Sequence, residues 1–144
     1  IASDHAPHTI QEKSQPFSGG APSGVPGVET MLPLLMNAVT ERTVTLDDVI
    51  TKTVTNPCQI LGIPAPSLTP GSRADLAVYA DFPMKISSES LHSRCGWTPY
   101  EGMPGLFPVT TVIGGVPAWH DGEFTFGGGH MWKNTQTGQL RRKE

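Results

Sequence analysis

Cysteine, clustered positive charge and long apolar runs are all scarce in this sequence, and each scarcity excludes a class of protein. The two cysteines, Cys58 and Cys95, stand far apart without a Cys-x-x-Cys pair, so neither a zinc knuckle nor a disulfide framework is indicated. This cysteine usage fits a reducing compartment, and we expect a cytoplasmic protein. No apolar run approaches the ~18 residues that a membrane helix needs, and no signal-peptide pattern is recognisable, so we expect no membrane partner.

Positive charge gathers only at Arg141, Arg142 and Lys143, and the formal net charge is −3. A surface that binds nucleic acid generally needs a basic stripe, so we expect no nucleic-acid partner. Proline and glycine, by contrast, are plentiful, with 14 and 16 residues. This favours short elements joined by many turns over a helical bundle.

The densest polar cluster is the opening stretch Ile1-Ala2-Ser3-Asp4-His5-Ala6-Pro7-His8-Thr9. Pro7 lacks the N–H that a buried strand needs, so a strand entering this stretch should end near Asp4. The Asp4 carboxylate would then stand at the carboxyl end of a strand, with His5 and His8 on the following loop. Parallel α/β architectures collect their chemistry at that edge. By residue type alone, Asp4 equally suits a turn cap, and two loop histidines indicate a metal site only weakly.

The next stretch, residues 10–27, is rich in Ser, Gly, Pro and Gln, which predicts a long loop of the lid or ligand-binding kind, or a plain surface connection. We expect Glu12 and Lys13 to form a surface ion pair in it. The loop closes at Pro26-Gly27, where Gly27 can take positive φ or let a ligand approach the backbone.

Three packing helices are predicted next. Apolar residues at helical spacing predict the first over residues 28–39. Thr45 and Asp48 form a pair like a capping box ahead of the second, and Asn56 caps a third that stops at Gly62.

After residue 63 a cluster of prolines and Gly71 marks a boundary, and strand patterns follow. The strand patterns and their turns comprise a buried strand at 76–79, strands at 109–113 and 116–119 around Gly114-Gly115, and a second hairpin turn at Asp121-Gly122. Residues 84–100 should be a loop with one short strand.

Four motifs together resemble the dihydroorotase family of the amidohydrolase superfamily. The specific ones are Asp4-His5-Ala6-Pro7-His8-Thr9 with Glu12-Lys13, and Gly24-Val25-Pro26-Gly27-Val28-Glu29-Thr30-Met31-Leu32-Pro33-Leu34-Leu35. The supporting ones are Gly71-Ser72-Arg73-Ala74-Asp75-Leu76-Ala77-Val78, which is common among amidohydrolases, and Trp97-Thr98-Pro99-Tyr100-Glu101-Gly102.

The resemblance implies an α/β fold made of the C-terminal piece of a (β/α)8 TIM-type metallo-hydrolase barrel and the C-terminal strands of a small β-sandwich. Residues 1–63 would form the end of the barrel, with Ile1–Ser3 as its last strand, residues 64–126 the sandwich part, and residues 127–144 a flexible tail. The chain is too short for a whole barrel, which needs at least about 200 residues. It also starts without Met, so we expect a longer protein whose missing N-terminal part is a partner, leaving the sheet with an unpaired edge.

The same resemblance implies a zinc-dependent dihydroorotase, which reversibly hydrolyses the cyclic amide of L-dihydroorotate to N-carbamoyl-L-aspartate in pyrimidine biosynthesis. Asp4 matches the family residue that is both metal ligand and general acid/base. His8 matches the histidine that holds the substrate carboxylate, and Pro26 and Gly27 fall in the loop whose backbone lies along the substrate. The other ligands of the binuclear zinc centre would lie outside this chain, so we expect the chain alone to be inactive and to bind no metal tightly.

Two alternatives stay open. One is another cyclic amidohydrolase, a hydantoinase or allantoinase, although those enzymes do not generally need a donor at the position of His8. The other is a non-catalytic dihydroorotase-like scaffold subunit for aspartate transcarbamoylase, which has no need to retain Asp4 and His8 together. Besides the small-molecule substrate, the resemblance allows a homo-oligomer and aspartate transcarbamoylase as partners.

Overall fold

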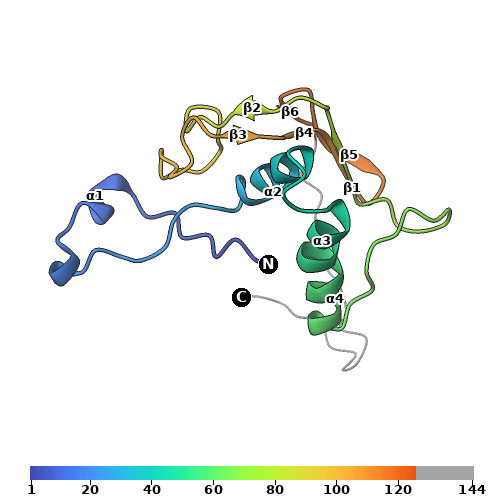
Figure 1. Ribbon diagram of the computed structural model, residues 1–144, viewed down its shortest axis with the longest axis horizontal. Coiled ribbons are helices and arrows are strands. Elements are labelled where there is room, and N and C mark those ends of the chain that lie inside the picture. Colours follow the sequence, from blue (N-terminus) through green and yellow to red (C-terminus); the bar gives the residue numbers. More distant parts are fainter. Residues whose placement is uncertain (126–144) are drawn as a thin grey trace. The chain divides into compact units, whose positions relative to one another are not determined.

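The computed structural model describes residues 1–125, which form two compact units (Figure 1). We call them the sheet unit, made of Ile1, Thr45–Ala80 and residues 108–125, and the motif unit, made of Ala2–Val44 and Asp81–Phe107. Each unit combines segments that are distant in the sequence. The tail expected at residues 127–144 lies outside the described residues. Across residues 1–125, no helix has the length and apolar character needed to cross a membrane.

A four-stranded antiparallel sheet forms the sheet unit, with the strand order β1-β4-β5-β6. Its strands are β1 (Leu76–Tyr79), β4 (Pro108–Ile113), β5 (Val116–His120) and β6 (Glu123–Phe124). The predicted strands and hairpins are therefore confirmed, but the burial predicted for 76–79 is wrong, because no residue of β1 is buried and Val78 is half exposed. Within residues 1–125, β1 and β6 are the edge strands of this sheet.

Backbone geometry explains why both hairpin turns were readable from the sequence. Gly114 and Gly115 have φ of 60° and 84°, and Asp121 and Gly122 have φ of 47° and 90°. Two-residue turns with positive φ at both positions match the twist of antiparallel strands, and Gly and Asp tolerate that conformation. The Gly114 N–H also donates to the Asp75 carboxylate over 2.6 Å, which attaches the first hairpin to the segment before β1.

Helices of the sheet unit run without a break from α3 (Leu46–Ile50) through the π-helical segment η2 (Thr51–Thr55) into α4 (Asn56–Leu61). The prediction that Asn56 caps a separate helix is wrong, because Asn56 itself is helical and its N–H bonds to the Thr51 carbonyl. Pro57 cannot donate a helical hydrogen bond, and the wider π turn before it accommodates the missing bond. The predicted stop at Gly62 is confirmed, with φ of 63°.

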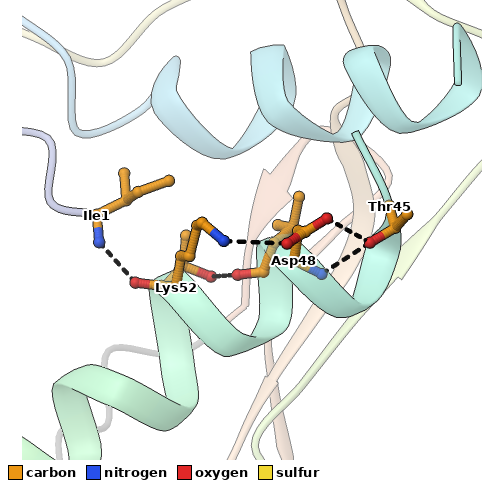
Figure 2. A network of polar contacts seen from close by, with 6 residues as sticks. Ile1, Thr45, Asp48 and Lys52 are labelled. Carbon is orange, nitrogen blue, oxygen red and sulfur yellow. Dashed lines mark hydrogen bonds and ion pairs between the residues drawn. The ribbon is translucent and has the colours of Figure 1, made fainter. Parts of the chain in front are cut away.

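The start of α3 is held by a network of polar contacts (Figure 2). The Thr45 hydroxyl accepts from the Asp48 N–H over 3.1 Å and donates to the Asp48 carboxylate over 2.7 Å. Lys52 donates to the same carboxylate over 3.0 Å, and its own carbonyl accepts from the Ile1 amino group over 2.6 Å. The predicted pairing of Thr45 with Asp48 is confirmed. The hydrogen bond from Thr45, followed by Lys52, lowers the pKa of Asp48.

Replacing Thr45 by alanine is expected to destabilise the chain by about 1 kcal/mol, because an N-cap acceptor is lost. The lowered pKa of Asp48 means that its contribution is present above the unfolded-state pKa and is lost as the pH falls through the folded-state pKa. Thr45→Ala should therefore lose less stability on acidification than the unsubstituted chain. Urea midpoints at neutral and acidic pH test this, with Thr45→Ser as the control that keeps the hydroxyl. Equal midpoints for the alanine and serine variants would contradict the capping role.

The motif unit is built around helix α2 (Met31–Thr40) and a two-stranded antiparallel pair, β2 (Met84–Lys85) and β3 (Pro104–Gly105). Strand β3 lies beside α2 (Figure 1), and the Leu106 N–H donates to the Pro33 carbonyl over 2.9 Å. Ile86 and Leu106 are buried here and form the apolar centre of this unit. One short strand was predicted within 84–100 and is confirmed as β2, whereas the Pro-Gly strand β3 gave no strand pattern.

The helix predicted over 28–39 is confirmed with a later start, at Met31, and residues 28–30 form a turn that is closed by the hydrogen bond from the Met31 N–H to the Gly27 carbonyl. The strand expected at Ile1–Ser3 does not form, and residues 1–9 are irregular. A strand is defined by its ladder to a neighbour, and no described segment pairs with these residues.

Candidate functional site

Asp4 has a backbone φ of 45°, in the left-handed region that residues other than glycine rarely occupy. Asp tolerates this conformation better than most side chains, and strained backbone often accompanies functional positions. Its side chain is exposed and has no hydrogen-bond or ion-pair partner among residues 1–125. The Asp4 carboxylate is therefore open to solvent.

The His5 side chain joins the two halves of the signature. Its Nδ1 accepts from the Gly27 N–H over 3.0 Å and from the Val28 N–H over 3.2 Å. A nitrogen that accepts two hydrogen bonds carries no proton, so the arrangement selects the neutral imidazole with its proton on Nε2. The next residue adds a backbone bond from the Ala6 N–H to the Val25 carbonyl over 3.0 Å. The sequence assigned no role to His5, since nothing local links residues 22 positions apart.

Glycines at positions 24 and 27 allow the two halves to approach closely. Gly24 has φ of 84°, and a Cβ there would lie 2.6 Å from the Ala6 Cβ. Gly27 is outside the positive-φ region, and a Cβ there would lie 3.1 Å from the Ser3 carbonyl oxygen. The prediction that Gly27 takes positive φ is therefore wrong, and of these two glycines the one with positive φ is Gly24. Close approach does occur at Gly27, and the approaching group is the chain's own backbone.

Pro26 and Gly27 are both buried. The Gly27 N–H donates to His5, and the Gly27 carbonyl accepts from the Met31 N–H over 2.9 Å. Both backbone polar groups of Gly27 are thus engaged within the motif unit.

The stretch predicted as a long loop contains the short helix α1 (Ile10–Lys13) and the 3-10 turn η1 (Phe17–Gly19). Thr9 and Glu12 form a capping box, in which the Glu12 carboxylate accepts from the Thr9 N–H over 2.6 Å and from its hydroxyl over 2.8 Å. These hydrogen bonds lower the pKa of Glu12. The chain therefore becomes helical immediately after the polar cluster.

The Lys13 ammonium group donates to the carbonyls of Pro22 and Gly24 over 2.7 and 3.0 Å, and these hydrogen bonds close the stretch into a loop. The predicted Glu12–Lys13 ion pair is therefore wrong. Consecutive residues of a helix do not face each other, so the two side chains reach different partners.

The backbone of half-buried His8 is held on both sides. Its N–H donates to the Ala6 carbonyl over 2.9 Å, and its carbonyl accepts from the Trp97 indole N–H over 2.7 Å. Nearby, His92 bonds to the Glu29 carboxylate twice, through its N–H over 2.8 Å and its Nδ1 over 2.6 Å. Residues 92–97, which the sequence predicted only as loop, thus attach to both halves of the signature.

An open cleft of about 470 Å³ lies within the motif unit. It is lined by His5, Pro7, Thr9, Val28, Glu29, His92, Ser93, Arg94 and Cys95. Asp4, His8, Pro26 and Gly27 are not among its lining residues, although Asp4, His8 and Gly27 are each next in sequence to one that is. The cleft wall therefore combines the polar cluster, the residues just before α2 and the 92–95 segment.

A metal ion would need more ligands than this part of the chain supplies. Among residues 1–125, no three His, Cys, Asp or Glu side chains gather in a way that could hold one. The Asp4 carboxylate is a donor of a type that zinc accepts, but it offers a single ligand. By themselves, the described residues therefore do not fit a complete zinc site.

Two substitutions of His5 test its link to Gly27 and Val28. Asparagine places an acceptor oxygen near the position of Nδ1, so His5→Asn should retain slow exchange of the two amide protons. His5→Leu removes the acceptor, and both amides should exchange faster by about 5-fold or more, in line with the loss of a net hydrogen bond. NMR hydrogen exchange measures this, with the Ala6 amide as an internal reference. Unchanged exchange in His5→Leu would contradict the assigned contact.

Comparison with known proteins gives a consistent set of relatives, although no family model matches the chain. The dihydroorotase of Halobacterium salinarum is 42% identical over 125 residues, which cover 85% of this chain and 29% of that protein. The dihydroorotase of Methanosarcina acetivorans is 39% identical over 142 residues, covering 90% of this chain and 30% of that protein. The multifunctional protein pyr1-3 of Dictyostelium discoideum is 39% identical over 115 residues, covering 78% of this chain and 5% of that protein. The chain thus spans less than a third of the length of the dihydroorotases it matches.

Proposed function

Because this chain belongs to the dihydroorotase family, we propose that it is the part of such an enzyme that carries the general acid/base and the substrate-carboxylate histidine. The enzyme would reversibly hydrolyse the cyclic amide of L-dihydroorotate to N-carbamoyl-L-aspartate, a step of pyrimidine biosynthesis. The observation that carries this proposal is the joining of residues 4–9 to residues 24–28 by the His5 imidazole. Both halves of the signature are thereby assembled in one compact unit.

Hydrolysis of an unactivated cyclic amide requires a base for the attacking water and an acid for the leaving nitrogen. We assign both duties to the Asp4 carboxylate, whose exposure and lack of a described partner leave its oxygens available. When bound, zinc would lower the pKa of a water molecule to about 7 and polarise the carbonyl. Asp4 would be one ligand of that binuclear centre, and the others would come from sequence outside this chain. The proton that Asp4 accepts from water would pass to the ring nitrogen as the amide bond breaks.

The substrate is an anion, and His8 would hold its carboxylate through an imidazole N–H donor. Pro26 and Gly27 would line the substrate on the other side. The backbone polar groups of Gly27 are already engaged, so this contribution would be van der Waals contact through the Pro26 ring and the Gly27 Cα. We expect these two residues to shape the site and His8 to supply the charge recognition.

For the architecture of the whole protein, residues 1–63 would end a (β/α)8 barrel, and residues 64–126 would add strands to a β-sandwich. The antiparallel sheet between residues 76 and 124 supports the sandwich part, whereas the compact units cut across this boundary, with residues 45–63 in the sheet unit and residues 81–107 in the motif unit. Aspartate transcarbamoylase and a second copy of the chain are the proposed protein partners. The proposed compartment is the cytoplasm.

The test is an assay of a protein that contains this chain together with the remaining dihydroorotase sequence, on dihydroorotate, hydantoin and allantoin. The proposal expects turnover of dihydroorotate well above the other two. Turnover of hydantoin or allantoin without dihydroorotate would assign the chain to another cyclic amidohydrolase. No turnover with zinc supplied, together with stable binding to aspartate transcarbamoylase, would favour the scaffold subunit.

A further inference from the structure

We propose that residues 92–97 are a positioning element for His8, and that they act through the hydrogen bond from the Trp97 indole to the His8 carbonyl. Trp97 would thereby help the enzyme to select substrates that carry a carboxylate. This inference rests on the proposed function, since it takes His8 as the residue that holds the substrate carboxylate.

The first step of the argument is the fixation of the His8 peptide. The Trp97 N–H donates to the His8 carbonyl over 2.7 Å in a partly buried setting, across 89 residues of sequence. On the other side, the His8 N–H donates to the Ala6 carbonyl over 2.9 Å. The direction of a side chain follows from its backbone, so these two bonds restrict where the His8 imidazole can point. Removing the Trp97 donor removes one of the two hydrogen bonds that restrain the His8 peptide.

The second step is the rigidity of the segment that carries Trp97. At its start, His92 bonds to the Glu29 carboxylate through both its N–H and its Nδ1. In its middle, Cys95 is buried, and its sulfur lies 3.0 Å from the Ser93 hydroxyl and 3.5 Å from the Trp97 carbonyl. A segment fixed at its start and middle can hold Trp97 in a defined place. Glu29 stands just before α2, so the segment braces the second half of the signature against the first.

The third step links position to specificity. A hydrogen-bond donor that shifts by about 1 Å loses much of its contribution, because both distance and angle deteriorate. Only ligands with a carboxylate use the His8 donor. Loss of the Trp97 bond should therefore weaken the binding of dihydroorotate. The binding of dihydrouracil, which has the same ring without the carboxylate, should not change.

The main test is Trp97→Phe in the protein that contains this chain and the remaining dihydroorotase sequence. Phenylalanine keeps an aromatic ring and removes the N–H. The KM for dihydroorotate should rise about 3- to 10-fold, as expected for one neutral hydrogen bond, with kcat changed less than about 2-fold. The inhibition constant of dihydrouracil should stay the same. In a double variant with His8→Ala, Trp97→Phe should add nothing further to KM.

Matched variants separate this role from a general loss of structure. Trp119, in β5, packs edge to face on Phe124 with ring centroids 4.8 Å apart, and Trp119→Phe should leave KM unchanged. Glu29→Gln keeps a hydrogen-bond acceptor and weakens the other anchor of the segment. It should raise the KM for dihydroorotate in the same direction by about 2- to 3-fold, again without an effect on dihydrouracil.

The inference would be overturned if Trp97→Phe weakened the binding of dihydroorotate and dihydrouracil equally, or if its effect on KM added fully to that of His8→Ala. The proposed function would be unaffected by either result. If the unsubstituted protein fails to turn over dihydroorotate, the proposed function fails. The hydrogen bond itself is then tested by NMR, where the Trp97 indole signal is identified by its loss in Trp97→Phe. Rapid exchange of that proton would show that the contact is absent and would overturn the inference independently.

Discussion

Asp4→Asn is expected to lower kcat on dihydroorotate by at least about 10³-fold in a protein that contains this chain and the remaining dihydroorotase sequence. An amide cannot accept the proton of the attacking water or return it to the leaving nitrogen. It is also a poorer metal ligand than a carboxylate, so both proposed duties of Asp4 fail together. The measurement is the steady-state rate with zinc supplied in excess.

Asp4→Asn should change catalysis without changing the stability of the fold. Asn tolerates the left-handed conformation about as well as Asp, so φ of 45° adds no strain to the variant. The Asp4 side chain is exposed and has no described partner to lose, so the unfolding midpoint should stay the same. Asp47→Asn, at an exposed position in α3, is the control for removal of one surface charge. If Asp4→Asn retained a tenth or more of the activity, Asp4 could not be the base.

His8→Ala is expected to raise the KM for dihydroorotate about 10- to 100-fold, with a smaller change in kcat. A hydrogen bond to a charged group contributes about 1.5–3 kcal/mol, which corresponds to this range. The effect should appear in KM, because the substrate carboxylate is present in the ground state and in the transition state alike. Initial rates over a range of dihydroorotate concentrations separate the two parameters.

Another histidine provides the control for His8. His120 stands in β5 of the sheet unit, where its Nδ1 lies 2.9 Å from the Thr110 hydroxyl. His120→Ala removes an exposed imidazole without touching the signature, and KM should stay unchanged. Unchanged KM and kcat in His8→Ala would remove His8 from carboxylate recognition, whatever the result for Asp4.

Much of the fold could be predicted from local sequence rules. The Gly114-Gly115 and Asp121-Gly122 turns were readable because positive φ at both central positions requires such residues. The Thr45 cap and the Gly62 stop depend on groups within a few positions of the helix end, so the pattern alone located them. The pairing of β4 with β5 and of β5 with β6 followed from these turns, since a two-residue turn places its two flanking strands side by side.

Predictions failed where two local rules competed. Asn56 with Pro57 has the residue types of a helix start, but the preceding helix continues through a π turn that tolerates the proline. Glu12 and Lys13 carry opposite charges side by side, but a helical backbone turns them toward different partners. In both places the outcome depended on the conformation of the preceding residues, which the pattern did not specify.

For the candidate site, the sequence by itself determined the chemistry on offer: a carboxylate and two imidazoles within five positions, and the resemblance that gives them roles. Only the tertiary structure decided which groups hold them in place. His5 reaches Gly27 and Val28 across more than 20 residues, and Trp97 reaches His8 across 89. These contacts depend on how the chain returns on itself. No periodicity or local spacing encodes that return, so the bonds that orient the site become visible only once the chain is folded.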